Sequence, residues 1–432
     1  MVKQASGSPY PSKELVEPVE APVAQRGWRS TFASLAIANY RWYWISGVTA
    51  SMTMQMRQVT RGWLVYYGLS QSPLDLALAM ASFGVPMTML SLVGGTVADR
   101  LPKRTLIFAT NLGSGLSSLL IGLLVLQGTV DLWHLLVIGI LDGAHMSFNM
   151  PSRQGMIPAL VDRDLFMNAS ALSMGAMNAS RVVAPALAVA LIPLVRIEGV
   201  FFVMAALNVI ASLTIMLVTV SGTRAKDTTK DWRLKQEVFR GVSYVVSDRT
   251  LLSVVTLAFV TIFLGMGCFV LMPAFVVEAF DGGSGALGLL LSVSGVGAVA
   301  GSIALASLGN PRRKGALFLG AALAMALGVL AFSLSRDLVL ASAMMLMVGF
   351  TTSVFMSTNI AILQLLSSPE MYGRVMSISM MSWGLMPLGV IPVSIAAERI
   401  GTPNALTVAA GLLVGVVIVS TLLNRTVRRL EV

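Results

Sequence analysis

The stretch Gly94-Gly95-Thr96-Val97-Ala98-Asp99-Arg100-Leu101-Pro102-Lys103-Arg104 separates two long apolar runs, at roughly 75–93 and 105–126. Each run is long enough to cross a lipid bilayer as a helix. A dense group of charges between two such runs predicts a tight turn at one face of a membrane. Because basic residues outnumber acidic ones in this turn, the positive-inside rule places it in the cytoplasm.

The composition of the 432-residue chain is typical of a membrane protein. Hydrophobic residues make up 56% and charged residues only 12%, and the mean hydropathy is +0.80. So few charges could not cover a surface in water, and we expect lipid to face much of the chain. The net charge of +10 falls in short loops between apolar runs, which fits control of membrane topology and not nucleic-acid binding.

Residues that carry chemistry in enzymes are sparse. The single cysteine, Cys268, excludes an internal disulfide and any Cys-x-x-Cys motif, and two histidines, His134 and His145, argue against a His-built metal site. The sequence contains no nucleophile elbow, phosphate-binding Gly-rich loop or His-Glu-x-x-His motif. We therefore expect neither an enzyme nor a bound metal or cofactor.

Apolar runs of bilayer length are predicted six on each side of one long polar connector. They fall at about 42–67, 75–93, 105–126, 132–151, 168–194, 199–220, 250–274, 286–308, 315–334, 338–363, 374–397 and 405–423. We predict an all-α membrane protein with twelve transmembrane helices in two pseudo-symmetric six-helix bundles. A disordered cytoplasmic tail, the first bundle, a cytoplasmic connector, the second bundle and a cytoplasmic tail are expected at 1–35, 36–220, 221–249, 250–424 and 425–432.

The distribution of charge and an internal repeat both agree with this arrangement. Most basic loop residues fall in loops assigned to the cytoplasm, whereas the loops assigned to the outside hold only Arg196, Arg336 and Arg399. This bias places both termini in the cytoplasm. The second half repeats the opening pattern in weaker form, from Gly301-Ser302-Ile303-Ala304-Leu305 to Arg312-Arg313-Lys314. Six spans repeated in parallel are typical of secondary transporters.

The opening motif also resembles a known family. Gly95-x-x-x-Asp99-Arg100-x-x-Lys103-Arg104 resembles the loop between helices 2 and 3 of the major facilitator superfamily, with Pro102 where that family usually has Gly. Three further stretches resemble a branch of bacterial exporters that includes the enterobactin exporter and macrolide efflux pumps. These are Trp63-Leu64-Val65-Tyr66, Pro151-Ser152-Arg153-Gln154 and Gly373-Arg374-Val375-Met376-Ser377. The resemblance implies two bundles that rock about a substrate site near the middle of the bilayer.

The resemblance assigns a gating role to the opening motif. Asp99 is expected against the positive N-terminus of helix 11, near Arg374, where it would hold the cytoplasmic side shut. Arg100, Lys103 and Arg104 would anchor that face. The alternative is that this loop only fixes topology. In related drug/proton antiporters helix 5 carries a Gly-Pro pair; here Ala184 precedes Pro185, and Pro185 is expected to kink the helix.

A charged group in the middle of a bilayer is costly and needs a reason. Asp142 falls near the middle of the fourth span, and burial favours the neutral acid, so a carboxyl there could take up and release a proton. The alternative is a structural acid paired with an arginine. His145 lies three residues on and shares the face of Asp142. It could relay a proton, or it could be a neutral, hydrogen-bonded core histidine.

Three arginines also fall within predicted spans. Arg57 and Arg61 lie one turn apart on the first span and share a face. We expect Arg57 to face a central cavity, where it could hold an anionic group of the cargo or pair with Asp142. Arg61 could do the same or extend its guanidinium to the outer interface. Arg181, near the centre of the fifth span, is expected to be a structural or gating partner of Asp142.

Other side chains are candidates for contacts between helices or with cargo. Asn149 and Gln58 are polar residues within spans and are expected to form hydrogen bonds between helices or to line the cavity. Methionines recur along the spans, as filler or as part of an adaptable lipophilic cavity. Arg57 and Arg181 favour an anionic or zwitterionic cargo, unless Asp142 neutralises them.

The predicted function is secondary active transport in the bacterial inner (plasma) membrane by a monomer. The favoured form is proton-coupled export of small amphipathic compounds such as drugs, siderophores or metabolites, by alternating access. No ATP-binding motif occurs, so the driving force is expected to be an ion gradient. Two alternatives remain, which are an uptake symporter or facilitator of the same fold, and a membrane sensor or scaffold that transports nothing.

Overall fold

The computed structural model describes residues 32–220, 234–308, 313–368, 371–423 and 428. Every regular element in these ranges is a helix, as the all-α prediction requires. Most of the predicted N-terminal tail, residues 221–233 of the connector and all of the C-terminal tail except Arg428 lie outside the described residues. The described end of the N-terminal tail is ordered. Ser34, in the short helix η1 (Ala33–Ala36), is buried, and its backbone and hydroxyl both donate to Asn168.

The helices follow the predicted spans with some differences at their ends. In the first half they are α2 (Ala38–Trp63), η2 (Leu64–Ser70), α3 (Pro73–Arg100), α4 (Lys103–Leu126), α5 (Leu132–Gln154), α6 (Ile157–Leu160) and α7 (Arg163–Met216). In the second they are α8 (Leu234–Ser247), α9 (Arg249–Gly265), α10 (Gly267–Val270), α11 (Met272–Phe280), α12 (Ser284–Ser307), α13 (Lys314–Leu334), α14 (Leu338–Leu366), α15 (Tyr372–Ile400) and α16 (Thr402–Leu423).

By length and composition, 8 of the described helices could cross a membrane. One of them, within α7, is 53 residues long. At 1.5 Å per residue α7 would measure about 80 Å, more than twice the thickness of a bilayer's hydrocarbon core. The backbone of α7 breaks once, at Arg196, where φ is 58° and ψ is 174°. This break separates two segments that match the spans predicted at 168–194 and 199–220.

The turn predicted at 94–104 is shorter than expected. α3 continues through the motif to Arg100, and only Leu101 and Pro102 lie between α3 and α4. Gly94 lies within α3, directly against the backbone carbonyl of Ser147 in α5, where any side chain would collide. The fall in hydropathy at residue 94 therefore marks the approach to the interface and not the end of the helix.

Two further stretches differ from the sequence analysis. The predicted connector contains a helix, α8, whose Val245 packs in a buried cluster with Leu251 and Val254 of α9. The span predicted at 250–274 consists of α9, α10 and α11, with Met266 and Leu271 between them, and extends to Phe280. The phenolic oxygen of Tyr244, on α8, also accepts a 3.2 Å hydrogen bond from the backbone N–H of Ser368.

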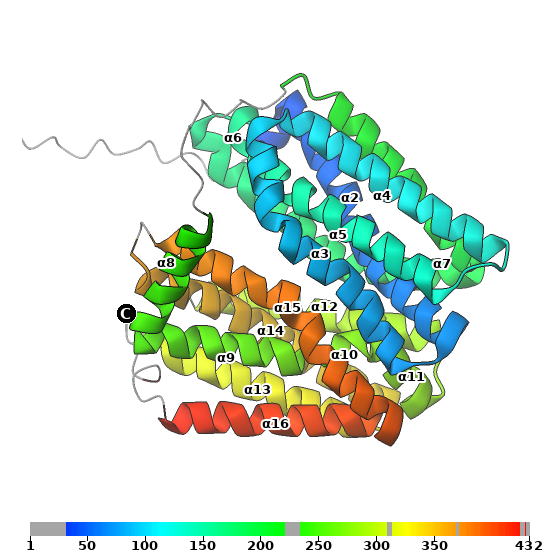
Figure 1. Ribbon diagram of the computed structural model, residues 1–432, viewed down its shortest axis with the longest axis vertical. Coiled ribbons are helices and arrows are strands. Elements are labelled where there is room, and N and C mark those ends of the chain that lie inside the picture. Colours follow the sequence, from blue (N-terminus) through cyan, green and yellow to red (C-terminus); the bar gives the residue numbers. More distant parts are fainter. Residues whose placement is uncertain (1–31, 221–233, 309–312, 369–370, 424–427, 429–432) are drawn as a thin grey trace, which may run out of the picture.

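The helices pack in two groups (Figure 1). The N-terminal group comprises α2, α3, α4, α5 and α7, and the C-terminal group comprises α9 to α16. The main contacts between the groups are those of α3 with α15 and of α7 with α12. We call the end that carries η2 and α11 the Trp63 end, and the opposite end, with the α3–α4 turn and α8, the Arg104 end. In Figure 1 the groups lie close together at the Trp63 end and diverge towards the Arg104 end.

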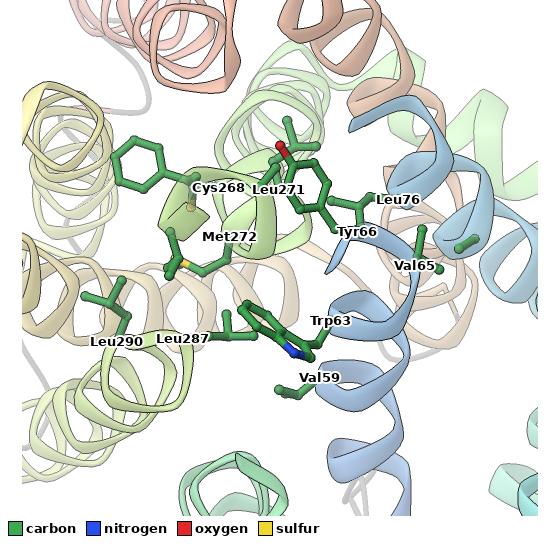
Figure 2. Packing of buried hydrophobic residues seen from close by; sticks show 14 of the residues in the cluster. Val59, Trp63, Val65, Tyr66, Leu76, Cys268, Leu271, Met272, Leu287 and Leu290 are labelled. Atoms are coloured by element: carbon green, nitrogen blue, oxygen red, sulfur yellow. The ribbon is translucent and has the colours of Figure 1, made fainter. Parts of the chain in front are cut away.

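The buried side chains show the same asymmetry. At the Trp63 end one continuous cluster joins Trp63 and Tyr66 to Met272, Phe275 and Leu287 of the other group (Figure 2). At the Arg104 end each group has a cluster of its own. The N-terminal cluster is built on Tyr40, Tyr43, Ile107 and Met156. The C-terminal cluster is built on Leu251, Phe318, Phe355 and Leu363.

The internal repeat in the sequence has a counterpart in the packing. Gly301 on α12, which repeats Gly94, lies against the backbone carbonyl of Phe350 on α14. The α3–α5 and α12–α14 pairs therefore use the same device, a glycine that lets two helix backbones approach closely. Both pairs are among the most extensive helix contacts in the molecule.

Candidate functional site

A buried ion pair lies in the middle of the N-terminal group. Nη1 of Arg57 on α2 is 2.7 Å from Oδ1 of Asp142 on α5, and the two side chains are 12% and 3% exposed. The second carboxylate oxygen, Oδ2, is buried and accepts no hydrogen bond from any described residue. The structure thus brings together the two residues expected to meet, and Asp142 does not face lipid.

A third helix completes this centre. Nη2 of Arg57 donates to the carbonyl oxygen of Ser114 and to the hydroxyl of Ser118, both on α4, at 3.0 Å each. His145 lies beside the pair, with Nδ1 3.8 Å from Oδ1 of Asp142. Gly113 on α4 makes room for its imidazole, since an added Cβ would lie 2.5 Å from Nε2. The predicted shared face of Asp142 and His145 is therefore present, although their separation exceeds a hydrogen bond.

Arg61 is buried, which corrects one of the two expectations for this residue. Its guanidinium does not extend to the outer interface. Nη2 donates to the backbone carbonyls of Ala79 and Leu135 and to the hydroxyl of Ser82, at 2.7 to 2.8 Å. Gly139 on α5 provides the space, because a side chain there would collide with the guanidinium. Three neutral oxygen acceptors stabilise the guanidinium inside the N-terminal group, in place of hydrogen bonds to water.

A second polar network, which the sequence analysis did not anticipate, lies nearer the Arg104 end. Nε of Arg153 donates to Oδ1 of Asn149 at 2.8 Å, and Nη2 donates to the hydroxyl of Ser46 at 3.1 Å. Nδ2 of Asn149 donates in turn to Thr110 and Asn111 on α4. Asn149 therefore joins helices, as one expectation had it, and belongs to this network rather than to the Asp142 pair. The spacing of Asn149 and Arg153, one helical turn, was the available signal.

Arg181 does not pair with Asp142, contrary to expectation. The next residue, Val182, contacts Gly295 of α12, where an added Cβ would lie 3.0 Å from Cα of Val182. Pro185 and Ala188, one and two turns further along the same side of α7, are buried where the groups meet. Arg181 itself is exposed and forms no hydrogen bond or ion pair within the described part of the chain. Arg181 therefore lies on the side of α7 that borders the other group, one residue from a contact with α12, and its own side chain stays exposed.

Gln58 occupies a comparable place on α2. It is exposed, and Gly62, one turn along the same side, approaches Pro273 of α11, with an added Cβ 3.5 Å from Cγ.

Pro185 produces no break in the backbone, because the only non-helical torsions in α7 are those of Arg196. A proline kink can keep helical torsions, so the kink predicted at Pro185 stays a prediction, and the break eleven residues later separates the two spans.

The basic residues of the opening motif are spread over different contacts. Nη2 of Arg104 donates to the carbonyl oxygen of Met216, at the end of α7, at 2.7 Å. Lys103 is buried beside Gly155, where an added Cβ would lie 2.7 Å from Cε, and Arg100 is exposed. The side chain of Asp99 lies outside the described residues, and its predicted contact near Arg374 stays a prediction. Gly95, unlike Gly94, has open space around its Cα.

Polar contacts also join the two groups at the Trp63 end. The hydroxyl of Tyr66 donates to Oε1 of Glu278 at 2.9 Å, and Glu278 also accepts from the backbone N–H and hydroxyl of Thr402. The hydroxyl of Ser72 donates to Oε1 of Glu398 at 2.6 Å. A cavity of about 410 Å³ is bordered by Tyr66, Ser72, Glu278 and Glu398. No pattern along the sequence connects Tyr66 with Glu278, so these contacts were not predicted.

Nothing described suggests a metal centre. No group of three or more His, Cys, Asp or Glu side chains among the described residues is placed to hold a metal ion. The buried polar groups instead form an ion pair and two hydrogen-bond networks inside a helical membrane protein, which is the kind of interior that transporters have.

Comparison with known proteins identifies the family. The family model described as "Transmembrane secretion effector" matches residues 29–431, and the chain belongs to this family of major facilitator transporters. The protein is therefore a membrane transporter of the major facilitator type and not an enzyme.

Curated relatives are distant. An uncharacterized MFS-type transporter of Bacillus subtilis (strain 168) is 29% identical over 140 residues, 32% of either chain. Macrolide efflux protein A of Streptococcus pyogenes is 20% identical over 90% of this chain and 96% of its own. The staphyloferrin A transporter of Staphylococcus aureus (strain NCTC 8325 / PS 47) is 21% identical over 80% of this chain and 86% of its own.

Solved structures of helical membrane transporters resemble the overall fold. The crystal structure of a bacterial homologue of the human lysosomal transporter Spinster has a TM-score of 0.69 at 14% identity. The match covers 93% of this chain and 98% of that chain. At this identity the likeness supports the fold and carries no information on cargo.

Proposed function

We propose that the protein exports small amphipathic compounds in exchange for protons, by alternating access. In this proposal the two helix groups are six-span bundles, twelve spans in all, in the inner membrane of a bacterium. The Arg104 end and both termini face the cytoplasm, as the positive-inside rule favours. The protein would act as a monomer. Efflux proteins among its relatives support the direction of transport.

The single observation that supports proton coupling most is the environment of Asp142. It is the one carboxylate buried in the middle of the described spans. Its Oδ1 lies 2.7 Å from Arg57, and its Oδ2 has no hydrogen-bond partner among the described residues. Oδ2 could take a proton without steric displacement of the arginine. A proton there would cancel the negative charge, weaken the attraction for Arg57 and free the guanidinium to change partners. Deprotonation would restore the pair, and a proton relay through His145 would need the 3.8 Å between Nδ1 and Oδ1 to shorten to a hydrogen bond.

The packing of the two groups supports alternating access. With the Arg104 end in the cytoplasm, the shared cluster at the Trp63 end closes the outside and the separate clusters leave the inside open. This corresponds to an inward-facing state. The opposite state requires that the shared cluster and the contacts of Tyr66 and Ser72 separate, while the α3–α15 and α7–α12 contacts rearrange.

Two alternatives are kept for the test. An uptake symporter or a facilitator would share this fold and the buried ion pair. A sensor or scaffold would transport nothing. The longest described helix outside the spans, α8, has 14 residues, which is too small for a soluble output domain, so the sensor is the less favoured alternative.

Reconstitution into proteoliposomes tests the proposal. Erythromycin, 2-naphthoate and 2-naphthamide serve as cargo probes, and both cargo and proton fluxes are measured under an imposed pH gradient. An antiporter moves cargo against the proton flux, a symporter moves both in one direction, and a facilitator ignores the gradient. We expect opposite fluxes for at least one probe, and Asp142→Asn should abolish the dependence on the gradient.

Asp281→Asn is the matched control, because Asp281 is an exposed acid at the end of α11 whose backbone conformation suits asparagine. It should transport as the unmodified protein does. Gradient-driven flux that persists in Asp142→Asn would remove Asp142 from the coupling mechanism. Absence of flux for all three probes in the unmodified protein would contradict the proposed function.

A further inference from the structure

The Arg, Lys, His, Asp and Glu side chains that lie well inside the described spans all belong to the N-terminal group. They are Arg57 and Arg61 on α2, Asp142 and His145 on α5, and Arg181 on α7. The described helices of the C-terminal group carry charges only near their ends. Three arginines face one carboxylate there, so the interior of the spans carries an excess of positive charge.

The three cations differ in how the protein stabilises them. Arg57 has the carboxylate of Asp142. Arg61 has three neutral oxygen acceptors and is buried. Arg181 has neither, since no described residue accepts a hydrogen bond from it and no described carboxylate is near it. An arginine keeps its charge in proteins, so Arg181 cannot escape the cost of burial by losing a proton.

The position of Arg181 makes this cost a problem for alternating access. Its side of α7 faces the C-terminal group, and Pro185 and Ala188 on that side are already enclosed where the groups meet. When the groups close at the other end, Arg181 must be enclosed too. Enclosing an unpaired guanidinium is strongly unfavourable, whereas enclosing it with an anion and good hydrogen bonds is not.

We infer that the cargo carries an anionic group, a carboxylate, sulfonate or phosphate, which binds the guanidinium of Arg181. This inference rests on the proposed transport function and names its substrate class. The apolar part of the cargo then lies towards the C-terminal group. Met80 of α3 and Met356, which are partly exposed, pack against the buried Met266, Met325 and Met386, and would offer it a soft, adaptable contact.

Equilibrium binding to the purified full-length protein in nanodiscs tests this without transport. The probes are 2-naphthoate, 2-naphthalenesulfonate and 2-naphthyl phosphate, with 2-naphthamide as a neutral compound of the same shape. We expect at least one anion to bind saturably and more tightly than the amide. In Arg181→Gln its affinity should fall by roughly tenfold or more, as loss of a charge-assisted hydrogen bond predicts, while the affinity of the amide is unchanged.

Two further variants sharpen the result. Arg181→Lys keeps the charge and should retain part of the affinity. Arg336→Gln removes an equal charge from an exposed residue between α13 and α14, and should leave all affinities within about twofold of the original, as surface charges are screened. Equal affinity of Arg181→Gln and the unmodified protein for the anions, a preference for the amide, or no saturable binding of any anion would overturn the inference.

The binding result and the transport result separate the two claims. Anion binding through Arg181 without any flux in proteoliposomes would keep the anion site and reject the transporter. Gradient-driven export of erythromycin or 2-naphthamide, unaffected by Arg181→Gln, would keep the transporter and reject the anionic cargo.

Discussion

The contact between Arg57 and Asp142 lowers the free-energy cost of burying either charged side chain in the membrane. Transfer of either charge into the membrane interior is expensive, and the pair is tolerated because each group satisfies the other and Arg57 also donates to Ser114 and Ser118. Asp142 depends on its partner more than Arg57 does. Arg57 has two further acceptors, but no other Lys or Arg among the described residues lies within ion-pair distance of Asp142.

Arg57→Gln should therefore destabilise the protein strongly. It leaves a buried carboxylate without its cation, which typically costs about 3 to 5 kcal/mol. The double variant Arg57→Gln/Asp142→Asn should recover most of that loss, because two neutral amides can be buried together. Thermal unfolding of the detergent-solubilised variants measures both, and a double variant no more stable than Arg57→Gln would show that the pair is not what holds these residues inside.

At the scale of the element, glycines determine how closely the helices approach. α3 meets α5 at Gly94, and α12 meets α14 at Gly301, in each case backbone against backbone. Adjacent glycines are not equivalent, because successive residues of a helix point in different directions. Gly94 faces the interface, whereas nothing lies within 4 Å of a Cβ added to Gly95. The opening motif thus contributes to packing as well as to topology.

Substitution of these two adjacent glycines separates their roles. Gly94→Ala should lower stability by about 1 to 3 kcal/mol, since the added methyl group forces α3 away from α5. Gly95→Ala should be neutral or slightly stabilising, because alanine favours the helix by up to about 1 kcal/mol and has space here. Thermal unfolding of the two variants side by side measures the difference. Equal melting temperatures would mean that α3 and α5 do not approach as described.

At the scale of the whole molecule, the two groups are joined unequally along their length. The shared apolar cluster and the hydrogen bonds of Tyr66 and Ser72 lie at the Trp63 end, while the Arg104 end has one cluster in each group. In both hydrogen bonds a hydroxyl of the N-terminal group donates to a carboxylate of the C-terminal group. A few bonds worth about 1.5 to 3 kcal/mol each can decide which end is closed when the two states differ little in free energy.

Tyr66→Phe should therefore increase the population that is open at the Trp63 end. Spin labels at Thr129→Cys and Arg336→Cys, exposed residues of the two groups, report the separation in a Cys268→Ser background, since Cys268 is the only cysteine. We expect a longer distance to gain roughly tenfold in relative population. Tyr67→Phe is the control, because Tyr67 is the next residue and is exposed. Identical distance distributions in the two variants would exclude Tyr66 as a closing contact.

The sequence predicted the helical membrane class and most helix positions well, for a physical reason. Apolar content and helix formation are local properties, because a helix in lipid satisfies its backbone hydrogen bonds within its own span. The burial of Asp142 could be predicted in the same way, from its depth in an apolar run. The ends of the helices were harder to predict from the sequence. The fall in hydropathy at Gly94 indicated a turn, but α3, which packs closely against α5 at Gly94, continues to Arg100.

What only the tertiary structure decided is the choice of partners. Asp142 pairs with Arg57 and not Arg181, Arg61 finds three neutral acceptors, and Tyr66 reaches Glu278 across the two groups. Each contact joins residues on different helices, so it depends on how those helices are rotated and how far they approach. Hydropathy along the chain determines that a charge must be enclosed, but only the packing of one helix against another determines which group meets it.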